Sequence, residues 1–333
     1  MNLQPIFIRE HVVKSIREYF YTLHFHEVIT PTLQGALPLE PNIYAFETTW
    51  FMVKRKKRAY LSVSPESGLK KMIALGIGNC FAIAKSFRNI EDAGSHHIPE
   101  FMMLEWYRTH ATYRDIMDDT KQLVQYVKRQ IDTYVGNPPG GTLMYQGRNV
   151  AIEGIWPTYS LVDLFRKYAG VALPEILDDK KMVKAAFRKG YRVANATWEQ
   201  LFHQIFLNEI EPKLGINPCF VTDFPSRISP LCAVNPKYPY LAQRFELYIA
   251  QMELANGNTE NTDIQNIKTV FANERNLRRK RNISAPPIDD VFIKALERMH
   301  ASSFAGCGLG IDRLAMILAN AKDITDVEPL SLK

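Results

Sequence analysis

Residues 87–107 read FRNIEDAGSHHIPEFMMLEWY, and this stretch decides the fold. Its two ends, Phe87-Arg88-Asn89 and residues 97–107, have the composition of β-strands, and residues 90–96 form a polar loop between them. We therefore expect two strands joined by a flexible loop that carries Arg and His. Such a hairpin suits a phosphate clamp, because a guanidinium group is a planar fork of donors that stays charged. A single arginine before a loop is, however, also typical of a solvated turn.

The segments around this hairpin predict an α+β fold. Residues 8–24 form an amphipathic helix, followed by an extended piece at 25–30 that Pro31 ends. Thr112 and Asp115 resemble a capping box at the start of a second helix. The apolar positions that recur on these two helices are Val12, Ile16, Phe20 and Leu23 in the first, and Ile116, Leu123, Val127, Ile131 and Tyr134 in the second.

Residues 136–141, GNPPGG, are the strongest chain breaker in the sequence. After them, residues 142–215 read as a hairpin followed by helices, and strand patterns return at 219–223 and 244–255. We expect one domain over residues 1–333, a mostly antiparallel sheet flanked by helices, with an insertion at about 137–215.

Three glutamates at seven-residue intervals, Glu246, Glu253 and Glu260, follow the insertion. If residues 244–256 form a hairpin that turns near Ala250, Glu246 and Glu253 can face each other across two strands. Paired carboxylates suit Mg²⁺, and Mg²⁺ suits a nucleoside triphosphate. The alternative is that these are solvated side chains of a half-exposed strand.

Near the C-terminus, residues 306–313 read GCGLGIDR. Alternating glycines on a strand leave room for a flat ligand or another backbone. The pattern lacks the strand–turn–helix context of a dinucleotide loop, so close packing of a helix and a strand remains an alternative. Arg313 and Phe101 could instead stack on the two sides of a purine base.

The composition excludes several classes of protein. Of 333 residues, 46% are hydrophobic and 23% are charged, which excludes a disordered or collagen-like chain. The net charge of +6 suits an anionic ligand without indicating a dedicated polyanion binder. The four cysteines lack metal-ligand spacing, and we find neither a signal peptide nor an apolar run long enough to span a membrane. We expect a soluble, cytoplasmic protein with no membrane partner.

The three segments resemble motifs 1, 2 and 3 of the class II aminoacyl-tRNA synthetases, and specifically the lysyl subgroup. Residues 25–31 resemble the dimer-forming motif 1, residues 87–105 motif 2 and residues 306–313 motif 3. The words SPE at 64–66, RFEL at 244–247 and ELANG at 253–257 are similar to the same subgroup. The similarity runs from about residue 8 to residue 330.

The motif 1 helix begins almost at Met1, so we expect no N-terminal anticodon-binding barrel. The pattern resembles the free-standing lysyl synthetase paralogues that attach lysine or β-lysine to a lysine side chain of elongation factor P. This resemblance implies an AMP-forming ligase that uses ATP and Mg²⁺, with elongation factor P as the acceptor protein, and a homodimer formed through residues 8–31. Basic runs at 54–58 and 278–281 are candidate partner surfaces.

The resemblance also implies roles for individual residues. At the nucleotide, Arg88 would hold the α-phosphate and the substrate carboxylate, His97 and Arg313 would lie near the outer phosphates, and Phe101 and Arg313 would enclose adenine. Glu91, Glu246 and Gly310 would complete the ATP site, and Glu246 and Glu253 would hold Mg²⁺. At the amino acid, Glu66 would take the α-amine, Glu105, Tyr107 and Glu260 the side-chain ammonium, and Asn256 the carboxylate, with Gly308 in the pocket wall. Arg88 and Arg313 would be the catalytic residues.

The sequence departs from the family pattern at three places. Ile90 stands where motif 2 has glutamate, and the loop is one residue longer, so that either Glu91 is the shifted equivalent or the contact is lost. Asn258-Thr259 replaces Phe-His of the paralogues or Phe-Ser of the synthetases, and Gly308 matches the synthetases rather than the alanine of the paralogues. The departures leave the choice between α-lysine, β-lysine and a related amino acid open.

Two other functions are compatible with the sequence. One is a lysyl-tRNA synthetase-like enzyme that charges tRNA or another carrier, which we expect less. The other is a non-catalytic regulator that binds an amino acid or a partner protein. Retention of Arg88, Glu246, Glu253 and Arg313 disfavours the regulator, because a binding protein needs neither a metal pair nor a phosphate clamp.

Overall fold

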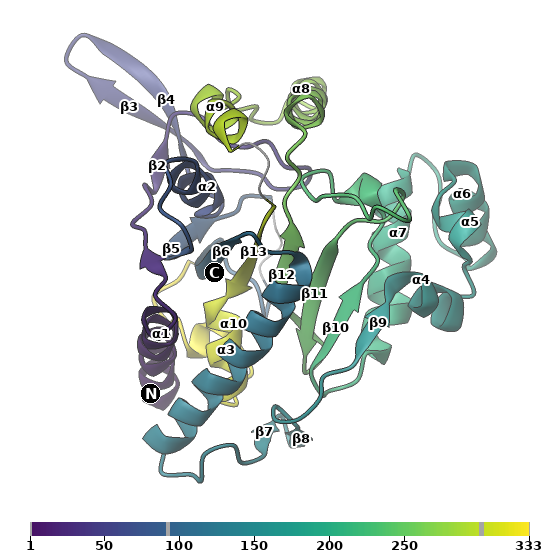
Figure 1. Ribbon diagram of the computed structural model, residues 1–333. Coiled ribbons are helices and arrows are strands. Elements are labelled where there is room, and N and C mark those ends of the chain that lie inside the picture. The colour runs from purple at the N-terminus through teal and green to yellow at the C-terminus, as the bar shows by residue number, and fades with distance from the viewer. Residues whose placement is uncertain (1, 91–93, 300–302, 333) are drawn as a thin grey trace.

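The computed structural model describes residues 2–90, 94–299 and 303–332, and it is built around an eight-stranded sheet (Figure 1). In spatial order the strands are β1 (His26–Glu27), β5 (Cys80–Phe87), β6 (Glu100–Thr109), β13 (Phe304–Gly310), β12 (Met252–Thr259), β11 (Arg244–Ile249), β10 (Cys219–Thr222) and β9 (Thr158–Ser160). Neighbouring strands from β5 to β10 pair antiparallel, whereas the edge strands β1 and β9 pair parallel. The predicted α+β class with a mostly antiparallel sheet is confirmed.

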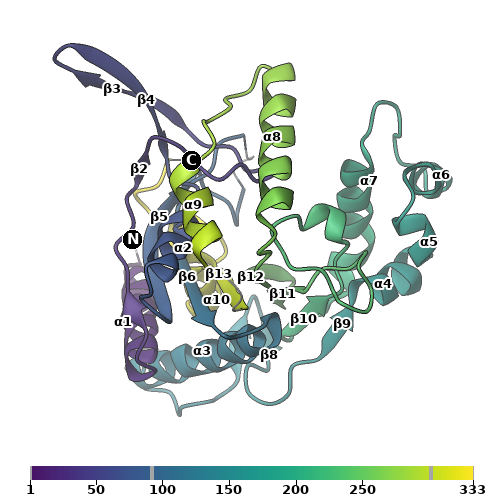
Figure 2. The ribbon, with the colours of Figure 1, turned by 45° about the horizontal axis from the view of Figure 1, so that its top comes forward.

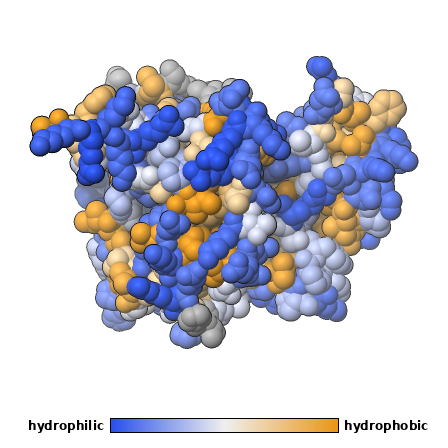
Figure 3. Space-filling model, turned by 90° about the horizontal axis from the view of Figure 1, so that it is seen from above, coloured by the Kyte–Doolittle hydropathy of each residue, from blue (hydrophilic) through white to orange (hydrophobic). Residues whose placement is uncertain are grey.

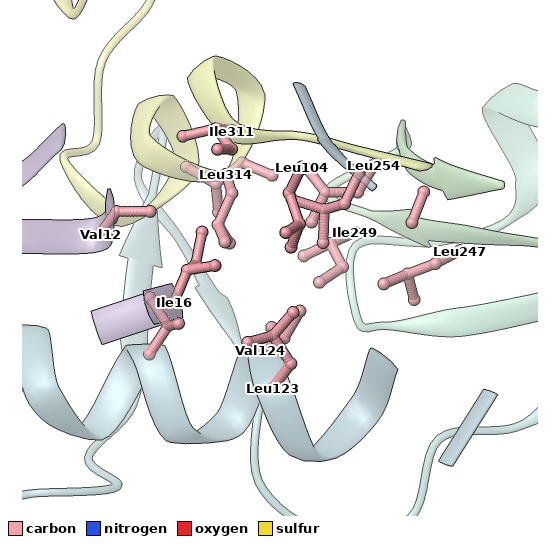
Figure 4. Close-up of a cluster of buried hydrophobic side chains, with 14 of the residues drawn as sticks. Val12, Ile16, Leu104, Leu123, Val124, Leu247, Ile249, Leu254, Ile311 and Leu314 are labelled. Carbon is pink, nitrogen blue, oxygen red and sulfur yellow. The ribbon is translucent and has the colours of Figure 1, made fainter. Parts of the chain in front are cut away.

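Three helices cover one face of this sheet: α1 (Gln4–Thr22), α3 (Tyr113–Tyr134) and α10 (Ile311–Leu318). Their apolar stripes meet strand residues such as Leu104 and Leu254 in the main core (Figure 4). Asp115 accepts a hydrogen bond from the Thr112 backbone N–H at 2.8 Å, as the predicted capping box requires.

Two residues of the predicted stripes lie outside this core. Leu23 follows the end of α1 and is 39% exposed, because the helix ends at Thr22 and the chain turns there. Tyr134 is 43% exposed at the end of α3, where its ring stacks on His11. Leu23 thus lies past the end of its helix, whereas Tyr134 points away from the core although the next residue, Val135, still packs against it.

Helices α2 (Glu66–Ala74), α8 (Ile264–Lys280) and α9 (Asp290–Arg298) pack against part of the opposite face (Figure 2). Their apolar side chains contact Cys80, Tyr107 and Phe304 of the sheet. The sheet therefore lies between two helical layers. The first turn of α2 borders the part of this face that the helices leave uncovered.

Between α1 and α2, the chain forms a hairpin of β3 (Glu47–Met52) and β4 (Arg55–Leu61), which pairs with β2 (Leu33–Gln34). The hairpin extends away from the body of the molecule (Figures 1 and 2). Trp50, Phe51 and Val53 near its tip are exposed, and so are the five cations of residues 54–58. Figure 3 shows a hydrophilic surface over most of the hairpin.

Residues 143–213 hold a small hairpin of β7 (Leu143–Tyr145) and β8 (Arg148–Val150), edge strand β9, and a helical region. Its helices are α4 (Leu161–Leu164), α5 (Leu173–Ile176), α6 (Asp179–Arg188) and α7 (Trp198–Ile205), with short turns at Phe165–Ala169, Phe206–Ile210 and Glu211–Lys213. These helices form a second apolar core with β10 and β11. Among the described residues, no helix combines the length and the apolar character needed to cross a membrane.

Candidate active site

A cavity of about 760 Å³ opens above the middle of the sheet, on the face that α2, α8 and α9 cover only in part. Strands β6, β12 and β13 provide much of its floor, and α2, α7 and α10 contribute to its walls. Twelve of the residues predicted from the sequence line it: Glu66, Arg88, His97, Phe101, Glu105, Tyr107, Glu253, Asn256, Glu260, Gly308, Gly310 and Arg313. Residues more than 200 positions apart in the sequence are thus brought to one site.

Two other predicted residues do not line the cavity. Glu246 is buried within β11, where Arg244 and Tyr248 hold its carboxylate. Glu91 lies outside the described residues. The neighbouring Ile90 is exposed and has a φ of 62°, a left-handed conformation that is uncommon for a β-branched residue. The isoleucine in place of the family's glutamate therefore lies at a sharp bend in the chain.

The acidic end of the cavity is built on β6, where residues two apart point to the same face. Glu105 and Tyr107 are such a pair, and the Tyr107 hydroxyl donates to Glu105 Oε1 at 2.6 Å. The second oxygen, Oε2, is buried and has no hydrogen-bond partner among the described residues. Burial and the neighbouring Glu66 raise the pKa of Glu105 well above its ordinary value. Oε2 of Glu105 can therefore accept a hydrogen bond from a ligand.

Glycines on β13 make room for these two side chains. Gly306 pairs with Tyr107, and a Cβ built there would lie 2.2 Å from the tyrosine Cε1. Gly308 pairs with Glu105, and a Cβ built there would meet the sulfur of Met103 at 3.6 Å, which is an ordinary contact. Gly306 is thus required by the position of the tyrosine ring, whereas Gly308 leaves open space beside the carboxylate.

Glu66 and Glu260 complete the acidic end together with two residues that the motifs did not indicate, Lys70 and Glu40. Lys70 Nζ lies 2.6 Å from Glu260 Oε2 and also donates to Glu66. Burial and the charge of Glu66 raise the pKa of Glu40 to about 8, and burial raises the pKa of Glu260 to about 7. The spacing of Glu66 and Lys70, one helical turn, could have indicated that their side chains lie together. Nothing in the sequence indicated that the loop with Glu40 lies beside them.

The cationic end of the cavity holds Arg88, His97 and Arg313. The Arg88 guanidinium lies over the ring of Phe101, 5.3 Å from its centroid. Arg313 Nη1 donates to the backbone carbonyl of Glu253 at 2.7 Å, and Nη2 donates to His97 Nε2 at 2.6 Å. Because arginine has no acceptor, Nε2 of His97 must be the unprotonated nitrogen. Burial and the Arg313 charge lower the pKa of His97 to about 4, which keeps the imidazole neutral.

The two carboxylates predicted to hold Mg²⁺ lie on the β11–β12 hairpin, which turns at Ala250 and Gln251 as expected. Because the turn lies at residues 250 and 251, Glu253 pairs with Tyr248, and Glu246 pairs with Asn256 rather than with Glu253. Burial and the charge of Glu253 raise the pKa of Glu246. No cluster of three or more metal-binding side chains occurs in the described part of the chain. Two carboxylates fit a Mg²⁺ that takes its other ligands from phosphates and water.

Comparison with known proteins assigns the family. A family model described as tRNA synthetases class II (D, K and N) matches residues 2–332. The chain belongs to this family. It is therefore an enzyme, an aminoacyl ligase of the class II synthetase type, and the resemblance drawn from its motifs is confirmed. ATP and Mg²⁺ are the usual requirements of this family.

Individual relatives of two kinds are similar to this synthetase-like chain. A lysine–tRNA ligase of Carboxydothermus hydrogenoformans is 32% identical over 97% of this chain and 64% of its own length. Elongation factor P–(R)-β-lysine ligases of Pseudoalteromonas translucida and Haemophilus influenzae are 32% and 31% identical, over 91% and 94% of their lengths. The chain thus spans just under two thirds of the first relative and most of the other two.

Proposed function

We propose that this enzyme activates lysine or β-lysine with ATP and transfers the aminoacyl group to a lysine side chain of elongation factor P. The observation that carries the proposal is the buried Oε2 of Glu105, which has no partner in the described part of the chain and lies in an acidic pocket beside Arg88 and Arg313. An unpartnered carboxylate oxygen at such a position favours a substrate with an ammonium group. The neighbouring cations favour a phosphate-bearing second substrate.

In the first step, the amino-acid carboxylate attacks the α-phosphorus of ATP, the bond to the β-phosphate oxygen breaks, and pyrophosphate leaves. The attacking group is already an anion, so no side chain has to act as a base. Catalysis then consists of positioning the reactants and neutralising phosphate charge. Arg88 holds the carboxylate and the α-phosphate, whereas Arg313, held in place by His97, lies at the outer phosphates.

Phe101 and Gly310 complete the nucleotide site. The ring of Phe101 offers an aromatic face for adenine, and Gly310 lets the base approach the start of α10 closely. Glu246 and Glu253 would hold Mg²⁺, which supplies positive charge to the phosphate oxygens when it is bound. Arg244 and Tyr248 fix the orientation of the Glu246 carboxylate.

The amino acid binds at the acidic end. Glu66 takes the α-amine, while Glu105 and Glu260 take the side-chain ammonium, and Tyr107 orients Glu105. Asn256, whose side-chain oxygen accepts from Arg244 at 3.2 Å, uses its amide N–H₂ for the substrate carboxylate. The open space at Gly308 is compatible with the amino group of either α-lysine or β-lysine.

In the second step, the acceptor amine attacks the carbonyl carbon of the aminoacyl-adenylate, an amide bond forms and AMP leaves. Elongation factor P is the proposed acceptor because relatives that match over nine tenths of their length carry that activity in their names.

We propose that the 137–215 segment is an insertion that borders the active-site cavity. Glu199 and His203 of α7 line it, and Glu199 accepts a hydrogen bond from Asn42 at 2.7 Å.

We further infer a homodimer formed through residues 8–31. In that region and beside it, apolar side chains are exposed, and Ile29 is 96% exposed. Sedimentation equilibrium of the wild-type chain tests this inference, and a monomer at micromolar concentration would contradict it.

Exchange of labelled pyrophosphate into ATP tests the first step. Each amino acid is supplied separately, and exchange that depends on lysine or β-lysine supports the proposal. No exchange with any amino acid would support a non-catalytic binder instead. Offering elongation factor P and tRNA to the charged enzyme then separates the two possible acceptors.

A further inference from the structure

The acidic pocket contains a positive charge of its own. Lys70 is 3% exposed, projects from α2 into the cavity and lies 5.5 Å from the centroid of the Tyr107 ring. Its ammonium donates to Glu66 and, at 2.6 Å, to Glu260. Both partners are residues that the proposed function assigns to the substrate's ammonium groups. Lys70 therefore shares their carboxylates with the substrate.

The fold keeps this lysine charged. Glu66 and Lys70 are four residues apart, so they project from the same side of α2. Burial opposes the charge, but attraction to Glu260 and Glu66 raises the pKa of Lys70 above its ordinary value. Because a buried ion pair that loses one partner leaves an uncompensated charge, the three side chains act as one unit.

Charge counting shows what this unit does. When substrate ammonium groups favour the ionised forms of Glu66, Glu105 and Glu260, these three carboxylates and the Lys70 ammonium carry a net charge of −2 (1 − 3 = −2). Glu40, whose pKa burial raises to about 8, is largely protonated near pH 7 and adds little to the count. A diamino acid brings two ammonium groups, and its carboxylate lies at Arg88 instead. The charges of pocket and substrate then match.

We propose that Lys70 is a positioning residue that sets the preference of this pocket for diamino acids by holding Glu66 and Glu260 in place beside Glu105, so that all three carboxylates can receive the substrate's ammonium groups. The proposal rests on the proposed function, because it concerns the same amino-acid pocket. It adds a role for a residue that itself need not touch the reacting atoms. Lys70 lowers the pKa of Glu260 and fixes the positions of both partner carboxylates through its hydrogen bonds.

The test is Lys70→Met, which keeps most of the side-chain volume and removes the charge. Lysine-dependent pyrophosphate exchange is measured as a function of lysine concentration and pH. We expect the KM for lysine to rise at least tenfold while kcat falls less. We also expect the acid limb of kcat/KM to move to higher pH, because Lys70 lowers the pKa of Glu260 and its loss makes that carboxyl harder to ionise.

Lys128→Met is the matched control. Lys128 is equally buried and bonded to Asp132 on α3, but it does not line the cavity. Its loss should lower thermal stability and leave both the KM for lysine and the acid limb unchanged. A purely structural role for Lys70 predicts the same behaviour from both variants.

Lys70→Arg keeps the charge, and it is the variant to measure if Lys70→Met fails to fold. We expect its acid limb to stay at the wild-type position. The proposal is overturned if Lys70→Met keeps the wild-type KM and acid limb, or if Lys70→Arg shifts that limb. If the wild-type enzyme shows no pyrophosphate exchange with any amino acid, the proposed function is overturned as well. This result distinguishes the two failures.

Discussion

The Tyr107 hydroxyl donates to Oε1 of Glu105 at 2.6 Å and thereby fixes the carboxyl with its other oxygen free of protein partners in the described structure. The two residues are neighbours on one face of β6, and Gly306 and Gly308 lie opposite them on β13. A tyrosine and a glutamate on one strand therefore define the position at which we propose that an ammonium group binds.

Glu105→Ala should abolish lysine-dependent pyrophosphate exchange, and Glu260→Ala should do the same, because each leaves a substrate ammonium without a counter-charge. Tyr107→Phe should be milder, with a loss of about 1–3 kcal/mol, or roughly 5- to 150-fold in kcat/KM. Glu10→Gln, at an exposed position on α1, is the control. Unchanged exchange in both alanine variants would refute the pocket assignment.

Substitutions at the two glycines should separate packing from specificity. Gly306→Ala should destabilise the protein and impair exchange, because its Cβ would overlap the Tyr107 ring. Gly308→Ala should fold normally, because its Cβ meets Met103 at contact distance, and should change the relative kcat/KM of α-lysine and β-lysine. Thermal melts and exchange assays of both variants provide the measurements. Equal destabilisation by the two alanines would contradict this reading.

Lysine binding should release protons near neutral pH. Burial raises the pKa of Glu260 to about 7 and of Glu40 to about 8, from an ordinary value of 4.5. The folded chain therefore holds more protons than the unfolded chain between those values, and stability without substrate falls as pH rises through this window. Because a substrate ammonium favours the ionised carboxyl, affinity should rise with pH from 6 to 8. Calorimetric titrations in buffers of different ionisation enthalpy measure the protons released, and no buffer dependence would be the contrary result.

Charge reversal on the β3–β4 hairpin should affect the second step alone. Lys54 and Lys56 are exposed and lie far along the hairpin from the cavity residues. Lys54→Glu/Lys56→Glu should leave lysine-dependent exchange unchanged and slow transfer to elongation factor P several-fold at low salt, since complementary charge mainly accelerates association. Lys180→Glu/Lys184→Glu on α6 makes the same charge change elsewhere. Equal effects of the two pairs would exclude the hairpin as a docking surface.

Glu253→Gln should raise the Mg²⁺ concentration needed for half-maximal exchange, because it removes one of the two carboxylates that would hold the ion. Exchange measured against Mg²⁺ at fixed ATP is the assay. If the Mg²⁺ requirement stays the same while kcat changes, then Glu253 acts on the position of Arg313, to which its backbone carbonyl is bonded.

Much of this site could be predicted because its residues belong to regular elements with fixed periods. Glu105 and Tyr107 are two apart on a strand, so alternation places them on one face. The predicted pairing of Glu246 with Glu253 was wrong, because the hairpin turns at Ala250 and Gln251, one residue further along the chain than that pairing requires.

Lys70 and Glu40 of the acidic pocket were missed for different reasons. Lys70 and Glu66 have the spacing of an ordinary surface ion pair on a helix, and only the packing of α2 against the sheet turns the pair inward. Glu40 lies in a loop, and Arg278 of α8 donates to the carbonyl oxygens of Glu40 and Ile43. The basic run at 278–281, expected to be a surface, therefore contributes its first arginine to the interior.

The central sheet ends in strands of two and three residues, β1 and β9. Edges this short offer few free backbone groups on which a strand of another molecule could add, so they give little template for fibrous aggregation. The long strands that carry the pocket are all paired on both sides. The central sheet thus offers little opportunity for edge-to-edge polymerisation.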